Sequence, residues 1–174
     1  MYVAIERKPE NGCEIQTACC GESGIMLRLK LVKTAEEENA HVREDDQGIP
    51  HGTKVLKELV FPWANTNRIV CADSYFASVT TAEEMTKMGL RFIGTVKTAT
   101  RKFPMDALQR VEFTSRGQHK GMLHYDVNGK ADMLAFTWVD RERRCFIATA
   151  GSLQEGKPYK RMRWHQLEEG KELE

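Results

Sequence analysis

The chain has 174 residues and 41% of them are hydrophobic, so it is long enough to bury a core and too apolar for disorder over its whole length. It carries 26 Lys and Arg against 25 Asp and Glu, a formal charge of +1. This balance argues against autonomous high-affinity binding of duplex DNA, although it leaves a local basic patch open.

Residues 13–32 predict a β-hairpin. Residues 13–20 (CEIQTACC) and 25–32 (IMLRLKLV) are β-type runs, and the GESG segment between them has the length and glycine content of a tight turn. Along the second run, leucines alternate with polar residues, which predicts a half-buried strand. Residues 33–51 are polar and predict a loop.

A helix and a strand are predicted next. Apolar residues at helical spacing predict a helix over residues 52–65, closed or kinked by Pro62. The continuous apolar run at residues 67–72 (NRIVCA) is typical of a buried central strand.

A second helix follows this strand. Hydroxyl residues at 78–81 provide N-caps, Glu83 and Glu84 fall in the expected first turn, and Gly89 is the expected C-terminal glycine. Residues 90–96 (LRFIGTV) predict another strand. The order of elements indicates a mixed α/β fold whose later strands are parallel.

After residue 97 the pattern changes to short antiparallel strands. A basic loop (KTATRK) leads to a predicted helical turn at residues 104–110. Three β-type runs follow, separated by turn signals of which Asn128-Gly129 is the strongest, at residues 121–127, 133–139 and 144–150. The second half therefore predicts an antiparallel meander.

The cysteines and histidines are not arranged as a metal or catalytic cluster. The five cysteines have no zinc spacing, and reduced, buried thiols are the expected state. The five histidines are scattered and predict surface or turn positions. No secretory signal is apparent, and no run of about 18 apolar residues predicts a membrane span.

Asp73 is the strongest candidate for chemistry on position alone. It directly follows the predicted strand at residues 67–72 and precedes a helix, and ligands collect at this edge of open α/β sheets. A carboxylate there is suited to a divalent cation. An Asp after a strand is more often a turn former or a helix cap, and spacing alone favours that alternative.

Residues 73–78 (DSYFAS) resemble the D-N-x-F-T-S signature of piggyBac transposases, with Ser74 and Ala77 departing from the commonest residues. The downstream GTVK and RK segments, followed by Phe103-Pro104, resemble that family's G-T-V-R-x-N-R-K stretch and its apolar-Pro pair. Weaker similarity extends from Lys8 to His165, and residues 73–102 are its specific part.

The resemblance implies a ribonuclease-H-like core in which three Asp residues bind two Mg²⁺ ions for phosphoryl transfer to and from DNA. By motif match, Asp73 is the second of these Asp residues, a catalytic and metal-binding position. No Asp stands in residues 1–7, and residues 167–174 carry only glutamates. A lone carboxylate cannot hold two metals, so this chain alone is expected to lack nuclease activity and bound Mg²⁺.

Basic residues are candidates for contact with the DNA backbone. Lys97, Arg101 and Lys102 could touch phosphates, and a solvated basic loop is the alternative. Residues 157–164 (KPYKRMRW) interleave basic and aromatic residues, which suits nucleic acid or a strand or linker that lacks its partner. Asp126, Asp132 and Asp140 are expected at hairpin ends, and Asp45 and Asp46 in the polar loop.

The fold predicted is α/β, a partial ribonuclease-H-like mixed sheet with an antiparallel β insertion. Residues 1–100 are expected to form the partial core, 101–166 the insertion region and 167–174 a charged tail. The function predicted is that of an internal fragment of a transposase-derived protein, with a non-catalytic DNA- or protein-binding module as the alternative. The family resemblance implies DNA as partner, a transposase-like oligomer and a nuclear location.

Overall fold

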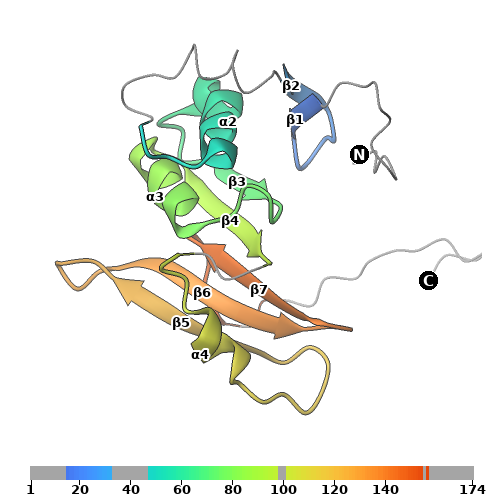
Figure 1. The fold of residues 1–174 in the computed structure, drawn as a ribbon, viewed down its shortest axis with the longest axis vertical. Helices are drawn as coiled ribbons and strands as arrows, with labels where there is room; N and C mark the ends of the chain where they lie inside the picture. The colour runs from blue at the N-terminus through green and yellow to red at the C-terminus, as the bar shows by residue number, and fades with distance from the viewer. Residues whose placement is uncertain (1–14, 33–46, 98–100, 155, 157–174) are drawn as a thin grey trace, which may run out of the picture.

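The computed structural model describes residues 15–32, 47–97, 101–154 and 156, which form two β-sheets and the helices that flank them (Figure 1). A five-stranded mixed sheet has the order β3-β4-β7-β6-β5, and a separate antiparallel pair joins β1 and β2. Predictions for residues 1–14, 33–46 and 157–174 lie outside the described residues. They include the predictions for Asp45 and Asp46 and for residues 157–164.

The predicted hairpin is present as β1 (Ile15–Cys19) and β2 (Met26–Leu31). Its turn closes through the Cys20 N–H, which donates to the Ile25 carbonyl at 2.9 Å, and Gly24 takes a φ of 70° that favours glycine. The prediction of a buried leucine face was wrong, since Leu29 is 58% exposed. The polar side chains of β2 instead contact helix α2, where Arg28 donates to the Glu58 carbonyl at 2.6 Å and Lys30 pairs with the Glu58 carboxylate at 2.8 Å.

The first predicted helix is α2 (His51–Val60), which passes into a 3-10 turn, η2 (Phe61–Trp63), at Pro62. The predicted closure at Pro62 is therefore confirmed. Its buried stripe recurs at helical spacing, because Val55, Leu56 and Leu59 are all less than 7% exposed.

Strand β3 (Ile69–Ala72), helix α3 (Val79–Lys87) and strand β4 (Arg91–Val96) form a parallel strand–helix–strand unit. Ser78 caps the helix, since its Oγ accepts the Thr81 N–H at 3.0 Å, and Gly89 ends it with a φ of 67°. Both end signals are confirmed. The prediction that Glu83 and Glu84 occupy the first turn was wrong, because the helix begins at Val79.

The prediction that residues 67–72 form a buried central strand was also wrong. Among the described residues, β3 is the edge of the five-stranded sheet and pairs only with β4. Ile69 is 54% exposed and Cys71 is exposed, while Val70 and Ala72 pack against the core. An apolar run distinguishes a strand from a loop, but it does not report which neighbours the strand has.

The meander consists of β5 (His119–Tyr125), β6 (Ala131–Val139) and β7 (Arg143–Ala148), as predicted. Gly129 takes a φ of 74° in the Asn128-Gly129 turn. Strand β7 pairs antiparallel with β4, with Val96 opposite Cys145, so the meander continues the sheet that begins with β3. The division of the chain near residue 100 into a core and an insertion stays a prediction.

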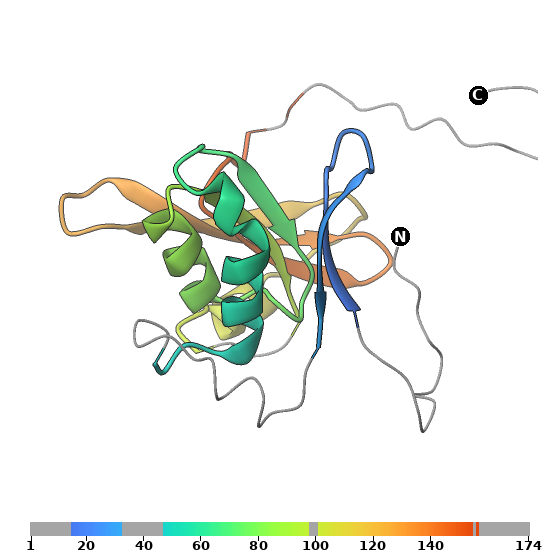
Figure 2. The ribbon, with the colours of Figure 1, turned by 90° about the horizontal axis from the view of Figure 1, so that it is seen from above.

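One face of the sheet carries the core. Phe92, Cys145 and Ile147 on β4 and β7 pack with Met85 of α3 and Leu108 of α4 (Met105–Gln109), and all are at most 5% exposed. Figure 2 shows α2 and α3 side by side over this sheet. Of the cysteines described, Cys145 is buried but Cys19 and Cys71 are exposed, so burial of all thiols was wrongly predicted. No helix in the described part of the chain has the length and apolar character to span a membrane.

Candidate active site

Asp73 directly follows β3, at the carboxyl end of the parallel pair β3–β4, where the sequence predicts it. Its Oδ1 accepts the Tyr75 N–H at 3.0 Å, and its carbonyl accepts the N–H of Ala77 at 3.1 Å. The half-buried carboxylate therefore also shapes the turn, as the alternative interpretation expected. The two roles are compatible because an ionised carboxylate has about four acceptor positions.

Hydrogen bonds of buried hydroxyl groups hold the loop at residues 73–78 in place. Thr81, which is fully buried, donates from Oγ1 to the Phe76 carbonyl at 2.6 Å. The same oxygen lies 2.8 Å from Thr53 Oγ1 on α2 and 2.9 Å from Ser78 Oγ. One buried threonine thus ties the loop after Asp73 to both helices, so the backbone at the end of β3 has a defined position.

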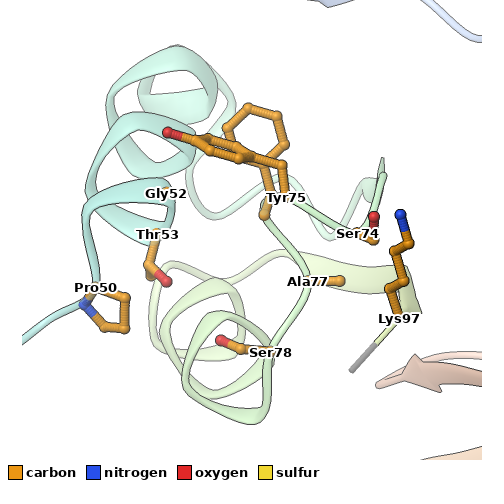
Figure 3. Close-up of a pocket in the computed structure, with 9 residues that line it drawn as sticks. Pro50, Gly52, Thr53, Ser74, Tyr75, Ala77, Ser78 and Lys97 are labelled. Atoms are coloured by element: carbon orange, nitrogen blue, oxygen red, sulfur yellow. The ribbon is translucent and has the colours of Figure 1, made fainter. Parts of the chain in front are cut away.

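A cavity of about 240 Å³ opens beside this loop (Figure 3). Its wall combines the beginning of α2, the whole segment after Asp73 and the end of β4, with these residues lining it: Pro50, Gly52, Thr53, Ser74, Tyr75, Phe76, Ala77, Ser78 and Lys97. Hydroxyl groups, one lysine and one exposed tyrosine provide its polar chemistry. Residue 52 must be small here, since a Cβ on Gly52 would lie 2.9 Å from the Tyr75 carbonyl oxygen.

Of the three sequence-predicted basic residues, Lys97 is the one that lines this cavity. It lines the cavity together with Ser74, the residue next to Asp73. The same two residues also line a second cavity of about 280 Å³, which extends toward α4 and the start of β7. The structure therefore brings Lys97 to the segment that carries Asp73.

The other two predicted phosphate contacts do not line this cavity. Arg101 and Lys102 are exposed, and Lys102 has a positive φ of 69°. Its ammonium group lies 3.5 Å from Glu83 on the exposed side of α3, with 67% of the side chain accessible. Lys102 thus faces α3, whereas Lys97 faces the cavity.

The remaining carboxylates of the meander are turn and surface residues, as expected. Asp126 accepts the N–H groups of Lys130 and Asn128 at 2.9 Å each, and these bonds lower the pKa of its carboxyl group. Asp132 contacts His124 at 2.7 Å, and Asp140 lies 3.8 Å from Arg116. Within the described ranges, no three His, Cys, Asp or Glu side chains are placed to hold a metal ion together. The described residues therefore do not by themselves fit an Mg²⁺ pair.

Two features of this region were not anticipated. Glu84 is buried on α3 and receives Lys57 at 2.9 Å and Lys87 at 2.6 Å, so it joins α2 to α3. Tyr75 is 54% exposed at the rim of the cavity. The local sequence predicts neither feature. It places Glu84 in the first turn of a helix, and it marks Tyr75 only as part of the DSYFAS motif.

Comparison with known proteins gives two findings. A family model described as Transposase IS4 matches residues 1–173. Among solved structures, a piggyBac transposase synaptic complex with hairpin DNA is similar, with a TM-score of 0.66 and 19% sequence identity. Comparison with curated proteins gives no match.

The structural match covers 90% of this chain but 31% of the piggyBac chain, so the present chain spans about a third of that protein. At this level of identity the match establishes the fold. It confirms the predicted mixed α/β, ribonuclease-H-like architecture, and the strand–helix–strand unit around Asp73 belongs to it.

Proposed function

Because this chain belongs to the Transposase IS4 family, a family of DDE-type, divalent-metal-dependent transposases, we propose that it derives from the catalytic domain of a piggyBac-type element. Its ancestral role is Mg²⁺-dependent cleavage and joining of DNA strands. The observation that carries this proposal is that Asp73 directly precedes the segment, Ser74 to Ser78, that lines a cavity together with Lys97.

Asp73 is proposed as one carboxylate of the ancestral metal site. Its Oδ1 is held by the Tyr75 N–H, and the loop behind it is fixed by the buried Thr81 hydroxyl group. A carboxylate that a nearby main-chain N–H already holds in place loses little conformational entropy when it binds a cation. A bound metal ion would stabilise the charge that develops at the phosphorus, but it would need further ligands besides Asp73.

Lys97 is proposed to contact a DNA phosphate next to Asp73, with Arg101 and Lys102 as outer contacts. A lysine provides a compact positive charge. Its contact with a phosphate positions the protein on DNA but does not distinguish one base sequence from another. The pairing of Lys102 with Glu83 is exposed and therefore weak, so a phosphate can compete for this lysine. Arg101 and Lys102 are thus expected to contribute less than Lys97.

The 174-residue chain alone is proposed to bind DNA without cutting it. The test is fluorescence anisotropy with a labelled duplex at several salt concentrations, together with incubation of supercoiled plasmid with Mg²⁺. Binding should weaken as salt increases, and loss of one phosphate contact in Lys97→Gln should reduce the slope by about 0.9. Lys130→Gln, in the exposed turn before β6, is the matched control.

Nicking of the plasmid that requires both Mg²⁺ and Asp73 would contradict the proposed inactivity. Failure to bind duplex DNA at low salt would contradict the phosphate contacts. A retained, non-catalytic module that binds DNA or a protein in the nucleus is the second candidate, and the near-neutral charge of +1 favours a protein over duplex DNA as its partner. For that candidate, Asp73→Asn should leave binding unchanged. Assembly into an oligomer, as in a synaptic complex, is proposed only for a longer transposase chain.

A further inference from the structure

Tyr75 presents an exposed aromatic ring at a cavity rim. It is 54% exposed, although its N–H donates to Asp73 Oδ1 and the carbonyl of the next residue, Phe76, accepts from Thr81. The ring meets Phe76 edge to face, with centroids 4.9 Å apart and an interplanar angle of 87°. Figure 3 shows the Tyr75 ring extending toward the Gly52 side of the lining residues, with Ser74 and Lys97, the residue after β4, on the other side.

The cavity offers three kinds of contact within one small volume. Tyr75 offers a flat apolar surface, Ser74 offers a hydroxyl group, and Lys97 offers a positive charge. Its volume of about 240 Å³ is below the roughly 300–1,000 Å³ of pockets for drug-sized ligands, which suits a single planar ring. An aromatic ring next to a basic group is the combination with which proteins bind unpaired nucleotides, through stacking and phosphate contact.

We propose that this cavity binds one unpaired nucleotide of DNA, with its base stacked on Tyr75 and its phosphate at the Lys97 ammonium group. The bases of an intact duplex are already stacked and cannot use the ring. Ser74 can donate to or accept from any base edge, so the site has little base preference. The inference rests on the proposed function, since it assigns a DNA strand to the cavity beside Asp73.

The rigidity of the loop supports this assignment. The Tyr75 carbonyl lies close against Gly52, where an added Cβ would be 2.9 Å away, and Ala77 packs against Gly94 of β4. The ring is therefore presented by a loop that two secondary-structure elements hold in place. A preorganised stacking surface loses little freedom on binding.

The test uses the whole 174-residue chain and two fluorescent probes, a short single-stranded oligonucleotide and a duplex of the same length. Tyr75→Ala should weaken binding of the single strand by roughly 5- to 100-fold, the usual effect of removing a stacking ring. Tyr75→Phe should retain affinity, whereas Tyr75→Leu, which is apolar but not planar, should not. Tyr125→Ala is the matched control, because Tyr125 is 55% exposed on β5 and does not line the cavity.

Duplex affinity should be the same in all these variants, and circular dichroism should show that Tyr75→Ala remains folded. If Tyr75→Ala and Tyr125→Ala bind the single strand as well as the unmodified chain, the inference is wrong, while normal duplex binding leaves the proposed function standing. If the unmodified chain binds neither probe, the proposed function fails as well.

Discussion

Thr53 and Thr81 place their hydroxyl oxygens 2.8 Å apart in the buried contact between α2 and α3. Both side chains are at most 2% exposed, and Thr81 also donates to the Phe76 carbonyl. This buried polar contact joins the two helices, as the Lys57–Glu84 pair does, and it also supports the loop that carries Asp73. The position of that loop depends on the Thr81 hydroxyl group, which does not line the cavity.

Thr81→Val should destabilise the chain by about 1–3 kcal/mol, because it leaves the Thr53 hydroxyl group and the Phe76 carbonyl without their partner. Urea denaturation followed by circular dichroism measures the change. Thr80→Val, on the partly exposed side of the same helix, is the control and should shift the free energy of unfolding by less than about 0.5 kcal/mol. Equal effects of the two substitutions would contradict the structural role of Thr81.

Glu84 makes the stability of the chain depend on pH. Burial alone would raise its pKa, but hydrogen bonds from Lys87 and Lys57 outweigh burial and hold the pKa below the usual value of 4.5. A lowered pKa in the folded state means that the stabilisation is complete above about pH 4.5 and is lost as pH falls through the folded-state value.

Glu84→Gln should therefore reduce stability at pH 7 and have less effect as pH falls through the lowered folded-state pKa, where the carboxylate of the unmodified chain becomes protonated. Chemical denaturation at a series of pH values gives both curves. Glu83→Gln is the control, since the Glu83 side chain is 38% exposed and its pairing with Lys102 is 3.5 Å long. A difference between Glu84→Gln and the unmodified chain that does not change with pH would be inconsistent with this assignment.

Gly94 lies where β4 passes the loop after Asp73. An added Cβ would come within 2.6 Å of the Ala77 Cβ and 2.8 Å of the Phe92 ring. Gly94→Ala should thus cost about 1–3 kcal/mol through overpacking. Thermal unfolding would measure the loss, with Gly21→Ala as control, because an added Cβ at Gly21 meets no atom within 4 Å. An unchanged melting temperature for Gly94→Ala would mean that the loop can shift without cost.

Arg143 joins β7 to the end of α4 and to the segment that follows α4. Its guanidinium group donates to the main-chain carbonyls of Leu108, Gln109 and Val111, and it lies 5.2 Å from the centre of the Phe113 ring. Arg143→Lys should destabilise the chain by about 1–3 kcal/mol, because an ammonium group cannot reproduce the fork of donors. Arg144→Lys, whose side chain is exposed and paired with Glu142, is the control for denaturation measurements.

Local chemistry made much of the fold predictable from sequence. Ser78 as a helix cap, Gly89 as a helix end and Asn128-Gly129 as a turn are signals that act within a few residues, and all are confirmed. The exposure of Leu29 was not predictable, because it depends on Glu58 of α2 binding the opposite, polar face of β2. The edge position of β3 similarly depends on which strands pair, and sequence alternation does not encode pairing partners.

The candidate site, like the fold, was predictable from sequence only in part. Asp73 could be placed at the end of a strand from its sequence context, and the structure confirms that position. The cavity could not be predicted, because its wall joins residues near 50, 75 and 97 that meet only in the folded chain. Tyr75 is a candidate binding residue only because the folded chain places it in this wall.

The pairing of β4 with β7 has a consequence for synthesis of the chain. Strand β4 ends at Val96, but its antiparallel partner β7 is complete only at Ala148. At about 5–20 residues per second, a ribosome needs roughly 3–10 s to make the intervening segment. During that interval one edge of β4 has no partner from β7 and the wall around Lys97 is incomplete. An unpaired strand edge is a site for pairing with other chains, so this interval is when the nascent chain is most open to such contacts along β4.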